Sequence, residues 1–126
     1  MSYVKSFRSL EVYRLSREIS ANIFRLSMAF PDTEKFSLTD QVRRSSRSVG
    51  AQIAEAWGKR RYEKHFISKL TDADSELLET EHWIEIAREC DYLNEQTEEQ
   101  LLQSCLSVSR MLNAMIDKSS LFCHQS

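Results

Sequence analysis

Glycine and proline are scarce in this sequence. Its 126 residues include two glycines and one proline. β-Sandwiches, barrels and doubly wound sheets need many tight turns, and tight turns depend on these two residue types. The glycines, Gly50 and Gly58, are also too few to form a Gly-rich loop that binds phosphate. The scarcity therefore excludes most strand-rich folds and favours long helices joined by few connections.

Cysteine and long apolar runs are also limited. The three cysteines, Cys90, Cys105 and Cys123, are widely spaced and form no C-x-x-C pair, which predicts free thiols in a reducing compartment. The first ten residues hold no apolar stretch of the kind found in signal peptides. No apolar run approaches the roughly 20 residues that span a bilayer. We therefore expect a cytoplasmic protein with no membrane partner.

The sequence does contain enough apolar material for a packed core. Hydrophobic residues make up 41% of the chain and charged residues 29%, which is typical of globular rather than disordered proteins. The formal net charge of −2 indicates no particular partner. We expect a single domain over residues 1–126.

Four segments repeat apolar or small residues at helical spacing. The predicted helices span about residues 10–29, 38–57, 62–90 and 97–119. The connections between them are short, so successive helices should run antiparallel. The sequence therefore predicts an all-α fold, an up-down-up-down antiparallel four-helix bundle.

Local signals suggest where these helices begin and end. Ser9 and Ser37 are predicted N-caps of the first two helices. Thr97 and Gln100 form a predicted capping box for the fourth helix. Gly58 is suited to the position that follows the last turn of the second helix.

The second predicted helix, residues 38–57, is rich in small side chains. Gly50 in its interior costs about 1 kcal/mol relative to alanine, and close packing against a neighbouring helix is the expected compensation. The second, third and fourth helices also carry more apolar or small positions than one packed seam needs. The excess predicts burial on a second side, and hence self-association.

Several motifs resemble the 23S rRNA intervening-sequence protein family. Residues 30–49 and 52–55 match a signature close to F-P-x-x-E-x-[FY]-x-L-T-x-Q-x-R-R-x-x-x-S-[IV]-x-x-N-I-A-E-G. Residues 7–13, 73–80, 86–87 and 92–93 also fit, so the resemblance covers nearly the whole chain. Two positions depart from the pattern, because Gln52 stands where the family usually has asparagine and Ala56 where it usually has glycine.

The resemblance implies a four-helix bundle that assembles as a ring-like homopentamer. Founding members of the family are encoded inside insertions of the bacterial large-subunit rRNA gene. A related branch comprises accessory proteins of diversity-generating retroelements, which bind nucleic acid and a reverse transcriptase. The molecular role of most members is unknown.

Charge is segregated along the chain. Residues 41–69 hold eight basic and two acidic residues, whereas residues 72–99 hold eleven acidic residues and one arginine. An elongated basic surface could neutralise the phosphates of RNA or DNA and release their counterions. The alternative is that surfaces of opposite charge meet between subunits or are simply solvated. The candidate nucleic-acid-binding residues are Arg43, Arg47, Lys59, Arg60, Arg61 and Lys64.

A second set of polar residues follows one side of the second helix. Arg44 and Glu55 lie about 16 Å apart along it, too far to pair. Each is therefore expected to meet a partner on another helix, and Glu79 is a candidate partner for Arg44. With Gln52, these residues form a candidate structural or interface set that fixes helix register or subunit packing. The alternative is a functional polar site.

Motifs for metal binding and catalysis are weak. Glu79 and His82 have the Glu-x-x-His spacing of di-iron bundles, but such sites need a second copy and two further glutamates. Cys123 and His124 are adjacent but lie near the chain end, which we expect to fray. We therefore expect no metal, no cofactor, no small-molecule substrate and no enzymatic activity.

The sequence thus supports two hypotheses of function. The first is a non-enzymatic oligomeric bundle, a homopentamer by the resemblance, that acts as a scaffold for nucleic acid or a nucleic-acid-processing partner. The second is a sequence-independent RNA- or DNA-binding protein that acts through the basic stretch 43–69.

Overall fold

Four long helices account for most of the fold. The structure, a computed structural model, describes residues 5–123. The long helices are α1 (Glu11–Ser27), α2 (Asp40–Gly58), α3 (Glu63–Glu89) and α4 (Glu95–Asp117), followed by the short α5 (Ser119–Phe122). Three single turns, η1 (Phe7–Ser9), η2 (Asp32–Glu34) and η3 (Lys35–Thr39), complete the regular structure, and no strand occurs within residues 5–123. The predicted all-helical fold is confirmed.

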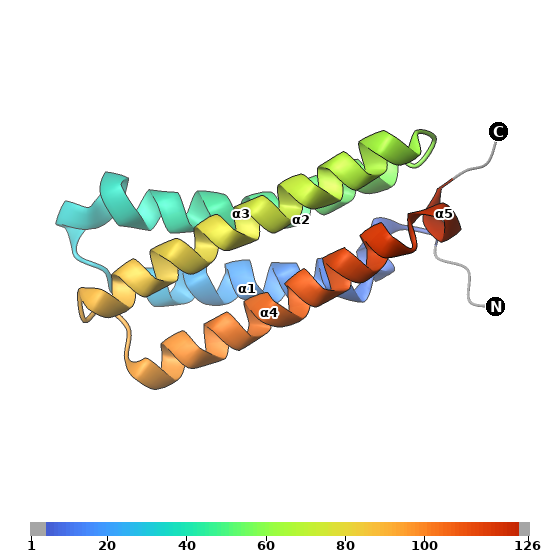
Figure 1. The fold of residues 1–126 in the computed structure, drawn as a ribbon. Coiled ribbons are helices and arrows are strands. Elements are labelled where there is room, and N and C mark those ends of the chain that lie inside the picture. Colours follow the sequence, from blue (N-terminus) through green and yellow to red (C-terminus); the bar gives the residue numbers. More distant parts are fainter. Residues whose placement is uncertain (1–4, 124–126) are drawn as a thin grey trace.

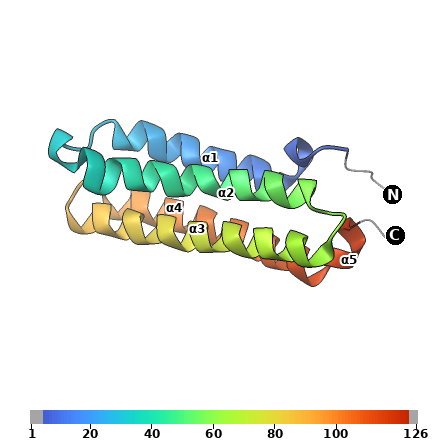
Figure 2. The ribbon, with the colours of Figure 1, turned by 90° about the horizontal axis from the view of Figure 1, so that it is seen from above.

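Successive long helices run in opposite directions and lie side by side (Figures 1 and 2). Around the bundle, α2 packs against α1 and α3, and α4 packs against α3 and α1. The contact between α2 and α3 is the most extensive. Each neighbouring pair therefore forms an outer face of the bundle, and the face between α1 and α2 lies across the bundle from the face between α3 and α4.

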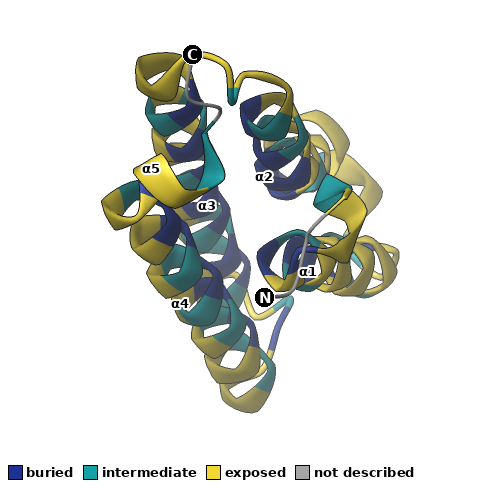
Figure 3. Cartoon of the chain, turned by 90° about the vertical axis from the view of Figure 1, so that its right-hand side faces the viewer, coloured by how far each residue is buried: buried dark blue, intermediate teal, exposed yellow. Residues whose placement is uncertain are grey.

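The buried residues lie on the sides of the helices that face the middle of the bundle (Figure 3). The buried residues of α3 recur at helical spacing, and the buried residues of the other helices meet them in one cluster. Within residues 5–123, no helix combines the length and the apolar character needed to cross a membrane. The buried stripe of α3 consists of Phe66, Leu70, Ala73, Leu77, Thr80, Ile84 and Ala87.

The predicted N-caps of the first and fourth helices are wrong. Leu10 occupies the cap position of α1, whereas the Ser9 hydroxyl donates to the Ser6 carbonyl at 2.9 Å within η1. Helix α4 begins two residues earlier than predicted, because the Asn94 side chain accepts from the Thr97 N–H at 2.8 Å. The path of the incoming chain decides which residue takes the cap position: Leu10 takes it in α1 without a side-chain hydrogen bond, and Asn94 takes it in α4 with one.

The start of α2 also differs from the prediction. The π turn η3 winds directly into α2, so Ser37 lies inside a helical turn and its hydroxyl donates to Glu34 at 2.7 Å. Tyr92, in the connection between α3 and α4, donates to the same carboxylate at 2.8 Å. These two donors lower the pKa of Glu34, Ser37 more than Tyr92. Glu34 thus links the two connections at this end of the bundle.

The predicted role of Gly58 is likewise wrong. Gly58 is the last residue of α2, and neither glycine has a positive φ. The left-handed position within residues 5–123 is instead Asp91, with a φ of 62°, just after α3. Aspartate tolerates this conformation better than most residues. The chain therefore reverses after α3 without a glycine.

Gly50 lies where α1 and α2 approach closely. A Cβ at this position would lie 3.2 Å from the Ser16 Oγ and 3.5 Å from the Tyr13 ring. The missing side chain therefore permits a close contact between the two helices. The close packing predicted from the small residues of this segment is confirmed at this point.

Candidate functional site

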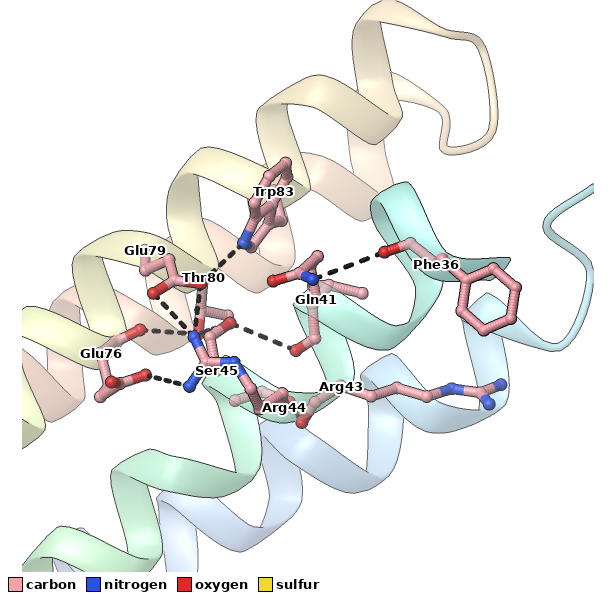
Figure 4. Close-up of polar contacts among 11 residues, drawn as sticks. Phe36, Gln41, Arg43, Arg44, Ser45, Glu76, Glu79, Thr80 and Trp83 are labelled. Carbon is pink, nitrogen blue, oxygen red and sulfur yellow. Dashed lines mark hydrogen bonds and ion pairs between the residues drawn. The ribbon is translucent and has the colours of Figure 1, made fainter. Parts of the chain in front are cut away.

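A polar cluster joins α2 to α3 near the middle of the bundle (Figure 4). The Arg44 guanidinium donates to both carboxylate oxygens of Glu79, at 2.9 and 2.7 Å, and lies 3.5 Å from Glu76. The Trp83 indole donates to the same Glu79 carboxylate at 3.0 Å. The sequence-predicted contact between Arg44 and Glu79 is therefore present.

A buried pair of hydroxyls lies beneath this cluster. Thr80 donates to the Ser45 Oγ at 2.9 Å, and both side chains are fully buried. Because Ser45 is small, α2 and α3 can approach closely there. The surface ion pair and the buried hydroxyl pair join the same two turns of α2 and α3, so together they set the register between these helices.

The Glu79 carboxylate should make the free energy of unfolding depend on pH. Hydrogen bonds from Trp83 and then Arg44 lower its pKa from the ordinary value of 4.5. Its stabilising contribution is therefore complete above that value and is lost as the pH falls through the lowered pKa. Urea unfolding at pH 7 should show Glu79→Gln less stable than wild type by under about 1 kcal/mol, because the pair is partly exposed.

At pH 3 the difference between wild type and Glu79→Gln should shrink toward zero. Glu99→Gln, at an exposed position on α4, is the matched control and should follow wild type at both pH values. A Glu79→Gln deficit that stayed constant from pH 7 to pH 3 would show that the carboxylate charge is not what links the helices.

The other two members of the predicted polar set lie further along α2. Glu55 pairs with Lys69 of α3 at 3.6 Å, so it meets a partner on another helix as expected. Gln52 lies between the two ion pairs, and its Oε1 is buried with no hydrogen-bond partner among the described residues. The structure therefore brings Arg44 and Glu79 together but leaves Gln52 and Glu55 outside their cluster.

The six predicted nucleic-acid-binding residues fall into two groups. Arg43 and Arg47 reach across to α1, where their guanidinium carbons lie 4.6 and 5.5 Å from the centre of the Phe24 ring. Arg43 also donates to the Ser27 hydroxyl at 2.8 Å. The remaining four, Lys59, Arg60, Arg61 and Lys64, lie around the turn between α2 and α3, at the far end of α2.

We call the turn that carries Lys59, Arg60, Arg61 and Lys64 the basic turn, and an aromatic side chain packs against it. The Arg60 guanidinium carbon lies 3.6 Å from the centre of the Trp57 ring, and its Nε donates to the Trp57 carbonyl at 2.9 Å. Beside the turn is a small open pocket of about 230 Å³. Its basic lining suits an anion such as a phosphate group. The pocket is lined by Lys59, His65, Ser68 and Lys69.

A larger open groove of about 750 Å³ follows the outer face between α1 and α2. Small residues contributed by both helices form much of its lining, and aromatic side chains, arginines and one glutamate contribute the rest. Sequence reasoning missed this groove, although small residues spaced three and four apart on the second helix were a signal for it. We call it the α1/α2 groove; it is lined by Tyr13, Arg17, Glu18, Ser20, Ala21, Phe24, Arg25, Arg47, Gly50, Ala51 and Ala54.

The weak metal and thiol motifs take other roles. Glu79 is engaged by Arg44 and Trp83, and the His82 ring lies beside Trp83. Within residues 5–123 no group of three His, Cys, Asp or Glu side chains could hold a metal ion. Burial raises the pKa of the Cys105 thiol to about 12, so it is not a reactive thiolate at neutral pH. His124 lies outside the described residues.

The fold and these surfaces define a helical bundle protein with segregated surface charge. The model of the 23S rRNA-intervening sequence protein family matches residues 8–114, and the chain belongs to this family. No curated protein matches the chain.

A solved structure shows the same fold. It is the crystal structure of a protein of unknown function from the S23 ribosomal protein family of Bacteroides thetaiotaomicron. The two chains share 27% identity with a TM-score of 0.75, over 84% of this chain and 95% of the other. The family is thus established, and a structurally similar protein is also of unknown function.

Proposed function

We propose that the protein is a non-enzymatic homo-oligomeric scaffold in the cytoplasm, whose partner is nucleic acid or a nucleic-acid-processing protein. The subunits would form a ring of five, a number that rests on the family resemblance. The observation that carries self-association is the apolar surface left on a single copy. Among the described residues, seven large apolar side chains are at least 40% exposed: Phe24, Met28, Phe36, Tyr62, Leu78, Leu106 and Leu121.

Exposed apolar side chains scattered singly need no explanation, whereas clustered ones indicate an interface. Leu78 and Leu106 lie on neighbouring helices, α3 and α4, and Phe24 borders the α1/α2 groove. Assembly would remove these side chains from water, and the burial of this apolar surface would favour assembly. The ion pairs between α2 and α3 would then keep each subunit rigid within the ring.

Self-association is tested by light scattering on a gel-filtration column. At micromolar concentration the wild-type chain should elute as one species with a mass several times the 14.8 kDa of the single chain. A mass near 14.8 kDa at that concentration would overturn the scaffold proposal.

Direct nucleic-acid binding is the second candidate function, and the basic turn between α2 and α3 supports it. Four cations and a basic pocket lie at one end of the subunit, so a ring would present several copies of the same surface. Repetition raises the effective affinity of a weak phosphate contact. Contacts of this kind read the nucleic-acid backbone rather than the base sequence.

Fluorescence anisotropy with labelled single- and double-stranded RNA tests this candidate at several salt concentrations. Binding should weaken as salt rises, and a variant with Arg60→Glu, Arg61→Glu and Lys64→Glu should lower the salt slope by roughly one for each phosphate that it no longer neutralises. Lys35→Glu, an exposed change in η3, is the matched control. Absence of binding at low salt would reject the candidate.

A further inference from the structure

Two opposite outer faces of the bundle differ in charge and shape. Figure 3, which views the bundle from one end, shows α1 and α2 on one side and α3 and α4 on the other. The first side carries the α1/α2 groove. The second side carries a row of acidic and leucine side chains. A surface that is complementary to another surface of the same molecule can join copies head to tail.

The α1/α2 groove is basic. Arg17, Arg25 and Arg47 line it with a single acidic residue, Glu18. None of the three arginines forms an ion pair with another residue in the described range 5–123. The Arg17 guanidinium instead donates to the Tyr13 hydroxyl at 2.9 Å. Three cations without an ion-pair partner in the described part of the chain therefore border a groove whose other lining residues, apart from Glu18, are small or aromatic.

The opposite face carries an acidic ridge. Asp74, Leu78, Glu81 and Glu85 follow one line of α3, because their spacing returns to the same side of a helix. This line faces α4, since Asp74 accepts from the Ser109 hydroxyl at 2.9 Å. We call these four residues, together with Leu106 of α4, the α3/α4 ridge.

The ridge is unpartnered within one copy. Leu78 is 60% exposed and Leu106 is 41% exposed. Among the residues that the structure describes, no acid of the ridge forms an ion pair. Partial burial, followed by repulsion from Glu85 and Asp74, raises the pKa of Glu81. The ridge therefore combines crowded negative charge with exposed apolar side chains.

We propose that the α3/α4 ridge of one copy docks into the α1/α2 groove of the next copy. The leucines would fill the space above the small residues of the groove, while the acids of the ridge meet the three arginines. This inference rests on the proposed self-association and names the surfaces that form it. The contact is heterologous, so each copy uses its groove for one neighbour and its ridge for another.

A second copy fits these observations better than a nucleic acid does. The phosphates of a nucleic acid could pair with the arginines of the groove, but they would leave Leu78 and Leu106 exposed to water. A second copy covers the basic groove and the apolar ridge in one contact. Complementary charge also fixes which surfaces meet, because the alternative contacts of groove with groove and ridge with ridge bring like charges together.

Charge reversal tests the contact. A groove variant with Arg17→Glu and Arg47→Glu, and a ridge variant with Glu81→Arg and Glu85→Arg, would each place like charges at every contact. Each variant alone should raise the dissociation constant of self-association at least about 100-fold, since like-charge contacts cost several kcal/mol. Arg14→Glu on α1 and Asp72→Arg on α3, both exposed and outside the two surfaces, are matched controls and should keep the wild-type mass.

Two rescues separate this contact from simple misfolding. A chain with all four reversals again has complementary surfaces and should recover the wild-type mass. An equal mixture of the two variants should form mixed complexes, because the unchanged groove of the ridge variant meets the unchanged ridge of the groove variant, although two kinds of subunit cannot alternate around a closed ring of five. Analytical ultracentrifugation measures the mass in each case, and far-UV circular dichroism confirms that the helices are retained.

The outcomes separate this inference from the scaffold proposal. If wild type is a single chain, self-association itself fails. If wild type assembles but the groove and ridge variants keep its mass, assembly stands and this contact is wrong. Variants that keep the wild-type mass but lose RNA binding would assign the groove to nucleic acid and likewise overturn the contact.

Discussion

Replacing Ser45 with leucine should destabilise the protein by about 2–4 kcal/mol. Ser45 is fully buried between α2 and α3, where it accepts a hydrogen bond from Thr80. Forcing a larger side chain into a packed core costs about 1–3 kcal/mol, and the loss of the hydrogen bond adds about 1 kcal/mol. The leucine would push apart the two helices that make the most extensive contact in the bundle.

Urea unfolding followed by circular dichroism measures this effect. Ser45→Ala is the matched control, because it removes the hydroxyl without adding volume and should cost only about 1 kcal/mol. If Ser45→Leu were no more destabilising than Ser45→Ala, the small residue would not be what allows α2 and α3 to approach.

Phe66→Ala should have an effect at least as large, about 3–5 kcal/mol. Phe66 is fully buried near the start of α3, and its ring stacks with that of Phe122 in α5 at a centroid distance of 6.0 Å. The substitution leaves a cavity that the rigid helices cannot close. It lies directly after the basic turn, so we expect increased amide hydrogen exchange in residues 59–65 as well as a lower Tm.

Phe36→Ala provides the comparison for Phe66→Ala. Phe36 is 75% exposed in η3, so its loss should change the free energy of unfolding by less than about 0.5 kcal/mol in the single subunit. Equal effects of the two substitutions on thermal unfolding would contradict the position of Phe66 in the core.

The helices and their buried stripes were predictable because helical periodicity is a local property. Phe66, Leu70 and Leu77 recur at steps that return to one side of a helix. Their spacing alone therefore defines an apolar side of α3, without knowledge of the helix that packs against it. The helix starts were harder to predict. The path of the incoming chain makes Asn94 the cap of α4 and places Ser37 inside the turn η3 before α2, and this path depends on tertiary contacts.

The candidate sites likewise include contacts that the sequence predicts and surfaces that only the packing of the helices defines. The contact between Arg44 and Glu79 could be predicted as a candidate, because Glu55 on the same side of the second helix is about 16 Å away and the third helix carries many acidic residues. The separation of Arg43 and Arg47 from the basic turn could not be read from a count of charges along the chain. Successive residues of a helix point in directions about 100° apart, so near neighbours in sequence reach different faces.

The α1/α2 groove was missed for a related reason. Arg17 and Arg25 lie on the first helix, outside the basic stretch 43–69. Only the packing of α1 against α2 brings them beside Arg47. A surface shared by two helices has no signature in either helix alone, so it required the structure.

Native mass spectrometry tests whether the chain self-associates, because it counts the chains in each complex. We expect the dominant species at micromolar concentration to contain five copies of the 14.8 kDa chain. A single dominant complex with another number of copies would correct the ring size and leave self-association standing. A spectrum containing only single chains would contradict it.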